Sequence, residues 1–209
     1  LGDVYKRQSS HASAEQDTLL YLYEPTLSPQ QQDVFDRMIN HASNSEFEVA
    51  STLSEFLLEA HPVEREHNRK LYGQLMINHG IIKSATLDYE QGLIAIEDGL
   101  GHLEHNRNPF SPALVRGIMA KAITEFSLNL SEQAEDTFRR AQHILHRNKG
   151  VYDSAQLQVI SWLTKTSLKQ GKVLAAYREQ RFSLRVAEQA FGPKSVELIP
   201  VSYTHLTLP

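Results

Sequence analysis

The 209-residue sequence contains no cysteine. Disulfide bridges and thiolate metal sites are therefore excluded, while the compartment stays open because cysteine-free proteins occur in reducing and oxidising spaces alike. No apolar run approaches the roughly 20 residues that a helix needs to cross a bilayer, so we expect no membrane insertion. The net charge is −4 and the basic residues form no cluster, which argues against nucleic acid or anionic lipid as the main partner.

Sequence motifs that carry catalysis are also missing. There is no Gly-rich phosphate loop, no nucleophile elbow and no His-Glu-x-x-His pair. We therefore expect no enzymatic activity and no cofactor. His102 with His105, and His143 with His146, are i, i+3 pairs that could each share a divalent metal. Histidine near a helix C-terminus also complements the helix dipole, and no third ligand is evident, so we predict no metal site.

Both ends of the sequence resemble translated sequencing adapter. These segments, residues 1–8 and 201–209, are left out of the fold prediction as non-native, and we expect the natural reading frame to continue beyond them. Residues 9–27 form an N-terminal segment in which Ala12-Ser13-Ala14 has the small-x-small form of a signal peptidase site. Export to the periplasm is expected if this motif ends a signal peptide, and a cytoplasmic location if it is an ordinary flexible terminus.

What the sequence does contain is a repeat with a period of 42 residues. Small residues stand at positions 50, 92, 134 and 176, and again at 99, 141 and 183. A fixed period of this size is typical of stacked structural repeats. Small residues seven positions apart lie two turns apart on one helix face, where they let a neighbouring helix backbone approach closely.

The stretches between these small residues have helical spacing. Ile118, Met119, Ala122, Ile123 and Phe126 recur at three and four positions, not in the alternation of a strand. Each repeat is therefore predicted to be a helical hairpin. The first helices of these hairpins are expected at about 66–87, 112–129 and 154–170.

An opening hairpin is predicted before these repeats. Ser28-Pro29 supplies an N-cap residue and a proline at the first helical position. The second helix is predicted to begin after an N-cap at Asn44 or Ser45 and to end at His61-Pro62. Hairpins are thus expected at about 28–61, 66–108, 112–150 and 154–192, with the start of another, in one repeat domain over residues 28–200.

The chain resembles the tetratricopeptide repeat family, in the longer-period form seen in kinesin-light-chain-like repeats. The resemblance covers about residues 66–199, and it implies an all-α, right-handed superhelical solenoid of antiparallel helical hairpins. The aromatic residue expected three positions after the first small residue is replaced by Lys83, Glu125 or Ser167. The residues that carry the resemblance are Gly80, Ala122, Thr164, Gly92, Ala134, Ala176, Phe138, Ala141, Gly171 and Gly192-Pro193.

The resemblance implies that the first helices line a concave groove in which peptides bind. The carboxylate-clamp subtype needs lysine and asparagine where this chain has isoleucine and methionine, so a receptor for acidic C-terminal tails is not expected. The groove residues implied by the resemblance are Gln74, Ile77, Ile81, Arg116, Met119, Ile123, Phe126, Gln158, Lys165 and Lys169.

The apolar members of this set leave the occupant of the groove open. They suit a hydrophobic peptide or helix, or the chain's own apolar residues 19–23, docked in extended form on the first helices. Alternatively, they pack between helices and form no binding surface. Trp162 is predicted to be a core residue rather than a platform for a ligand.

The expected function is a non-enzymatic protein–protein interaction scaffold whose partner is a peptide or protein segment. A second interpretation belongs to another class, a sensory input region of a larger signalling protein such as a membrane-bound cyclase or kinase. The sequence that follows Ile199 in the full gene would separate the two.

Overall fold

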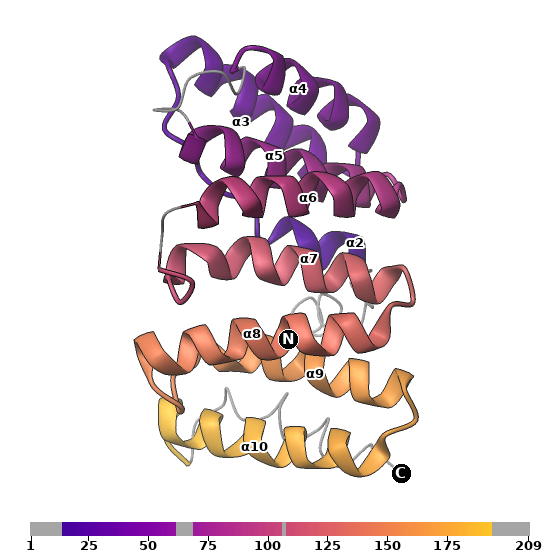
Figure 1. The fold of residues 1–209 in the computed structure, drawn as a ribbon, viewed down its shortest axis with the longest axis vertical. Helices are drawn as coiled ribbons and strands as arrows, with labels where there is room; N and C mark the ends of the chain where they lie inside the picture. The colour runs from indigo at the N-terminus through magenta and orange to yellow at the C-terminus, as the bar shows by residue number, and fades with distance from the viewer. Residues whose placement is uncertain (1–13, 62–68, 106–107, 194–209) are drawn as a thin grey trace, which may run out of the picture. The chain divides into compact units, whose positions relative to one another are not determined.

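The computed structural model describes residues 14–61, 69–105 and 108–193, and within these ranges every element is a helix (Figure 1). The all-α prediction is therefore confirmed for the described part of the chain. None of the helices described there has both the length and the apolar character that crossing a membrane requires. The adapter-like ends, 1–8 and 201–209, lie outside the described residues, as do Ala12 and Ser13.

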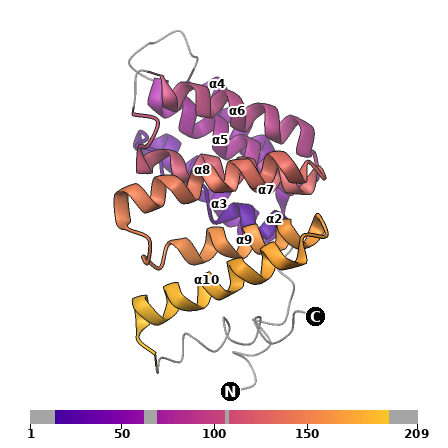
Figure 2. The same ribbon diagram turned by 60° about the horizontal axis from the view of Figure 1, so that its bottom comes forward.

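The described helices fall within the four predicted hairpins. A short helix, α2 (Ala14–Leu19), precedes them. In the last hairpin the two helices run side by side, joined by a tight turn (Figure 2). The hairpins are α3 (Pro29–Ser43) with α4 (Phe47–Glu59), α5 (Arg69–Ala85) with α6 (Tyr89–Glu104), α7 (Val115–Ser127) with α8 (Ser131–Lys149), and α9 (Gln156–Lys169) with α10 (Val173–Phe191); the 3-10 turn η2 (Pro112–Leu114) leads into α7.

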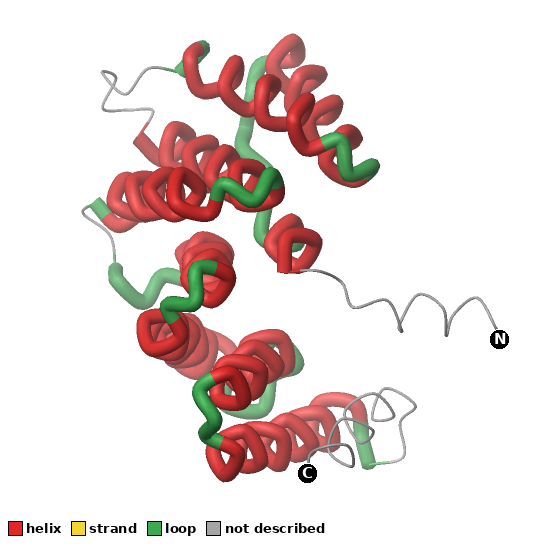
Figure 3. The backbone as a smooth tube through the Cα atoms, turned by 90° about the vertical axis from the view of Figure 1, so that its right-hand side faces the viewer, coloured by secondary structure: helices red, strands yellow, loops and turns green. Residues whose placement is uncertain are grey.

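The chain divides into two compact units, residues 1–99 and 100–209, with the boundary inside α6. The sequence predicted one repeat domain and gave no sign of this division. The core of the first unit is built from residues of α3, α4 and α5, among them Phe35, Met38, Leu57 and Ile82. In the second unit Phe138 is among the largest fully buried side chains. A short loop joins the two helices of each hairpin (Figure 3).

The turn inside each hairpin has the same geometry in all four repeats. A residue in the left-handed region, with φ between 62° and 72°, recurs every 42 residues. The amide that follows it donates to the carbonyl five residues earlier at 2.8–3.1 Å, which is the six-to-one hydrogen bond of a Schellman motif. The period therefore specifies backbone conformation as well as side-chain size. The left-handed residues are Ser45, Leu87, Asn129 and Gly171.

The start of α4 differs from the prediction. Ser45 was expected, with Asn44, as the N-cap, but the N-cap residue is Glu46. Ser45 adopts φ 62° because it belongs to the turn that closes α3, so the cap position falls on the next residue. The predicted start of α3 is confirmed: Ser28 is extended, and its amide donates to Gln31 Oε1 at 3.2 Å.

The small residues of α5 and α6 lie where the two helix backbones meet. A Cβ added to Gly92 would lie 2.8 Å from the carbonyl oxygen of Gly80, and one added to Gly99 would lie 2.7 Å from that of Gly73. Real Cβ atoms do not approach backbone atoms this closely. The predicted reason for the small residues, close approach of a neighbouring helix, is therefore confirmed in this hairpin.

Candidate interaction faces

The residues predicted to line a groove fall into two groups. Gln74, Ile77 and Ile81 lie on α5 in the first unit, and the others lie on α7 and α9 in the second. Each unit therefore has to be considered separately. Two of the α5 residues, Ile77 and Ile81, are completely buried, whereas Gln74 is half-buried.

The burial of the apolar members has a clear structural cause on α5. Gly99 of α6 lies against Ile77, close enough that a Cβ on Gly99 would sit 2.7 Å from Ile77 Cγ1. Ile77 therefore packs inside its hairpin. Met119 and Ile123 of α7 are equally buried, with exposed fractions of 1% and 0%. Ile77, Met119 and Ile123 therefore pack between helices, as the second of the two interpretations of these residues expected. They offer no apolar surface to a ligand.

Three aromatic rings, those of Phe126, Phe138 and Trp162, pack together in the second unit, and we call them the aromatic base of α9. Trp162 is only 2% exposed, which confirms its prediction as a core residue. Phe138 of α8 stacks on it with ring centroids 5.7 Å apart and planes inclined by 13°. Phe126 of α7 meets it edge-on at 5.4 Å. Rings in these geometries attract beyond their buried area, so the three helices are held together at this point.

Two lysines cover this base from the solvent side. Lys165 and Lys169 are both exposed and lie on successive turns of α9. The Lys165 ammonium is 4.0 Å from the centroid of Trp162, and the Lys169 ammonium is 4.1 Å from that of Phe126. Lys169 Nζ also donates to the Phe126 carbonyl at 2.7 Å. Desolvation lowers the pKa of Lys169.

Arg116 and Gln158, the remaining predicted groove residues of the second unit, are exposed as well. Gln158, Lys165 and Lys169 lie at spacings of seven and four residues, which places them on one stripe of α9. We call Arg116, Phe126, Gln158, Lys165 and Lys169 the α7–α9 face. Its exposed side chains are polar or cationic, in contrast to the apolar groove that the sequence suggested.

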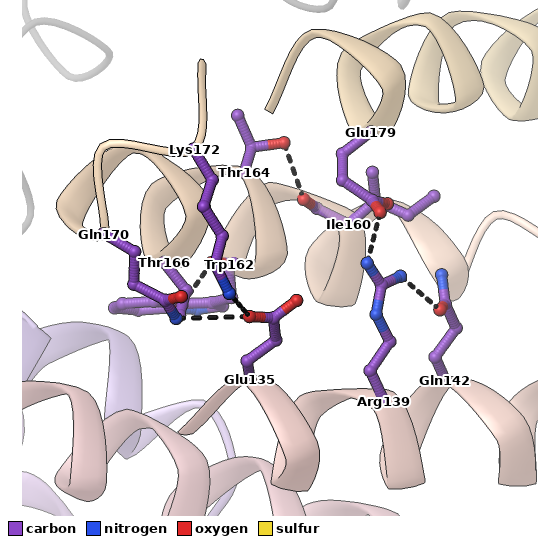
Figure 4. A network of polar contacts seen from close by, with 10 residues as sticks. All are labelled: Glu135, Arg139, Gln142, Ile160, Trp162, Thr164, Thr166, Gln170, Lys172 and Glu179. Atoms are coloured by element: carbon purple, nitrogen blue, oxygen red, sulfur yellow. Dashed lines mark hydrogen bonds and ion pairs between the residues drawn. The ribbon is translucent and has the colours of Figure 1, made fainter. Parts of the chain in front are cut away.

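A polar network joins α8 to α10 and to the turn between α9 and α10, and no sequence motif predicts it (Figure 4). Glu135 of α8 accepts hydrogen bonds from Lys172 Nζ at 2.9 Å and from Gln170 Nε2 at 3.2 Å. The hydrogen bond from Lys172 is the main cause that lowers the pKa of Glu135. Further along α8, Arg139 donates to Glu179 of α10 at 2.5 Å. These contacts join residues 35 to 40 positions apart, so they cannot be predicted from the local spacing of residues in the sequence.

The first unit carries a different kind of contact on α5. Asn78 is 1% exposed, and its side-chain amide pairs with the backbone of Tyr23. The Tyr23 amide donates to Asn78 Oδ1 at 2.7 Å, and Asn78 Nδ2 donates to the Tyr23 carbonyl at 2.9 Å. Tyr23, the last residue of the predicted segment 19–23, thus docks on a first helix. The segment is not extended throughout, because Leu19 ends α2 and Leu20 and Tyr21 form the turn that follows. The sequence does contain an indication of this contact. Asn78 stands among apolar residues of the helix, and a buried asparagine side chain needs hydrogen-bond partners.

A second buried polar pair joins α4 to α5 in the first unit. Ser54 Oγ lies 2.8 Å from His79 Nδ1 and also donates to the Ser51 carbonyl at 2.7 Å. Since the hydroxyl proton goes to the carbonyl, the imidazole Nδ1–H is the donor to Ser54, which is the reverse of an activated serine. Burial, and then the Lys83 ammonium, lower the pKa of His79.

In the second histidine pair, His143 and His146 each lie near a different aromatic ring. His143 lies 5.4 Å from Phe110, and His146 lies 6.4 Å from Phe182 in an edge-on arrangement. The two rings of this pair thus have separate neighbours. Among the residues that the structure describes, no three His, Asp or Glu side chains come together in a way that could hold a metal ion.

Comparison with known proteins gives no family or relative for the chain. A scan against protein-family models finds no match, and no curated protein matches the sequence. Two features of the structure therefore carry the functional proposals: the α7–α9 face, and the contact of Asn78 on α5 with Tyr23.

Proposed function

We propose that the chain is a non-enzymatic interaction scaffold of the tetratricopeptide type, and that its second unit binds an acidic segment of a partner protein on the α7–α9 face. The observation that carries the proposal is the pair of exposed lysines, Lys165 and Lys169, held over the rings of the buried Trp162 and the half-buried Phe126.

The chemistry of this pair suits carboxylates. Each ammonium has an aromatic ring on one side, which restricts the position of the charge and limits its hydration. The lowered pKa of Lys169 expresses the same desolvation, since burial makes its charged form more costly. A carboxylate placed near Lys165 and Lys169 would offset that cost by a charge-assisted hydrogen bond. Arg116 and Gln158 add further donors on the same face.

The acidic partner replaces the hydrophobic peptide that the sequence suggested. Met119 and Ile123, which were expected to receive apolar side chains, are buried. The side chains exposed on the α7–α9 face, those of Arg116, Gln158, Lys165 and Lys169, are polar or cationic. An acidic segment suits the positive charge of Arg116, Lys165 and Lys169 better than a hydrophobic helix does.

Selection from a random peptide library on the immobilised chain tests the proposal. We expect acidic peptides to be enriched, and the affinity of the best peptide to fall about tenfold or more in the Lys165→Ala/Lys169→Ala variant, because each charged hydrogen bond contributes about 1.5–3 kcal/mol. The matched control is Lys149→Ala/Arg178→Ala, which removes two exposed positive charges from α8 and α10. Equal losses in both variants, or enrichment of apolar peptides, would contradict the proposal.

A further inference from the structure

We propose that α5 carries a second binding site, specific for an extended peptide backbone, and that residues 23–26 of the same chain occupy it as an intramolecular ligand. This site lies in the first unit and is independent of the α7–α9 face. It rests on the paired hydrogen bonds between Asn78 and Tyr23 and on the burial pattern around them.

The Asn78 contact recognises main chain and not side chain. The carboxamide accepts from the N–H and donates to the C=O of one residue, so it imitates the hydrogen bonding of a neighbouring β-strand. Any residue except proline offers these two groups at that position. The contact therefore selects an extended chain, with little dependence on which residue stands there. Because Asn78 is buried, leaving it without such a partner is costly.

The segment itself alternates as a bound extended peptide does. Tyr23 and Pro25 are buried, whereas Glu24 and Thr26 are exposed. Alternate residues of an extended chain point to opposite sides, so one side of the segment faces the protein and the other faces solvent. The ligand class follows from this pattern: an extended segment with an aromatic residue and, two positions later, a proline, separated by a residue of any polar type.

The face of α5 that receives the segment coincides with part of the predicted groove. Gln74, Asn78 and Ile81 are spaced four and three residues apart and so lie on one stripe of the helix. The helix α2 packs on α5 as well, which brings the start of the segment to the same element. A tethered segment competes with any external peptide at an effective concentration of about 1 mM. The site is thus closed to weak ligands until the segment is displaced.

A labelled peptide that copies residues 17–27 tests the inference on the full chain. Tyr23→Pro removes the donor N–H and the aromatic ring from the tethered segment but leaves Asn78 intact. If a free peptide binds with Kd of about 100 µM, we expect this variant to bind it about tenfold tighter than the wild-type chain does, because the competitor at about 1 mM is lost. Adding Asn78→Ala to Tyr23→Pro should abolish the gain. Glu24→Ala, at an exposed position, is the matched control and should behave as wild type.

Hydrogen exchange in the wild-type chain gives a second measurement that needs no variant. An excess of the unlabelled peptide should speed exchange of the Tyr23 amide, which donates to Asn78, while the amides of α5 stay protected. The inference is overturned if a folded Tyr23→Pro chain binds the peptide no better than wild type. It is also overturned if Tyr23→Pro unfolds the first unit and excess peptide leaves exchange unchanged. Lys165→Ala/Lys169→Ala should not affect this binding, so failure here is distinct from failure of the α7–α9 proposal.

Discussion

The two units use the same hairpin and the same turn, yet the faces of their first helices differ. Asn78 on α5 and Trp162 on α9 occupy the same position of the 42-residue period. Asn78 pairs with the backbone of Tyr23, whereas the ring of Trp162 lies beneath the Lys165 ammonium. At the neighbouring position Ile81 is buried and its counterpart Lys165 is exposed. The period thus specifies backbone and packing, and leaves the chemistry of the face free to vary from repeat to repeat.

The largest expected effect on stability comes from removing the Trp162 ring from the aromatic base of α9. Trp162→Ala should lower the free energy of unfolding by about 3–5 kcal/mol, because a buried aromatic side chain is replaced by a cavity. Denaturant unfolding measures the loss. Leu174→Ala, on α10 at a position 74% exposed, is the control and should change stability by less than about 0.5 kcal/mol. A similar small change for Trp162→Ala would contradict its role in the core.

A pair of glycines on α6 sharpens the comparison of helix packing. Gly99→Ala places a Cβ 2.7 Å from the Gly73 carbonyl and should destabilise the first unit by about 1–3 kcal/mol, by overpacking. Gly101→Ala, two residues along the same helix, adds a Cβ that meets no atom within 4 Å and should stabilise the protein by about 0.5–1 kcal/mol. Thermal unfolding measures both. Two changes of the same sign would mean that the backbones are not in close contact at Gly99.

The shared turn can be tested in both units with opposite substitutions. Leu87 has φ 68° and its side chain is 65% exposed, so Leu87→Gly should relieve about 1 kcal/mol of backbone strain with little loss of packing. Gly171→Ala, at φ 72°, should introduce a similar strain of about 1 kcal/mol in the second unit. Urea unfolding provides the measurement. If Leu87→Gly destabilises the protein, the left-handed turn is not the source of strain at that site.

The smallest expected effect concerns pH and the first unit. Burial and Lys83 lower the pKa of His79, and Glu55 of α4 opposes them in part. The contribution of neutral His79 is therefore present above the unfolded pKa of about 6.5, and it is lost as the pH falls from there through the lower folded pKa. His79→Gln should flatten the fall in stability below about pH 6.5. His105→Gln, at an exposed position, is the control and should leave the pH profile unchanged.

The helices and their pairing could be predicted from the sequence because both depend on local spacing. The positions of small residues, such as Gly92 and Gly99, directly reflect the close approach of two backbones. The left-handed turns were not predicted. Gly171 and Asn129 are of types that favour positive φ, whereas the hydrogen bonds of the turn impose the same conformation on Ser45 and Leu87, residues that do not favour it.

The faces could be predicted only in part, because their chemistry depends on contacts between helices. The two exposed lysines of α9 were named as groove residues from the resemblance to the tetratricopeptide repeat family. Their aromatic partners depend on how α7 packs on α9, and an error of one residue in helix register turns a side chain by about 100°. The same uncertainty placed Ile77 in a groove, although it packs against α6. Asn78 was missed because its partner, Tyr23, lies 55 residues away.

That separation of 55 residues has a consequence for how the first unit folds. The turns of its hairpins close over five residues, and each can form as soon as its own stretch of chain is present. The pairing of Tyr23 with Asn78 must instead close a loop that contains α3 and α4, and contacts of long sequence separation slow folding. Residues 23–26 are synthesised well before α5, so they stay without their partner until the first helix of the second hairpin is complete.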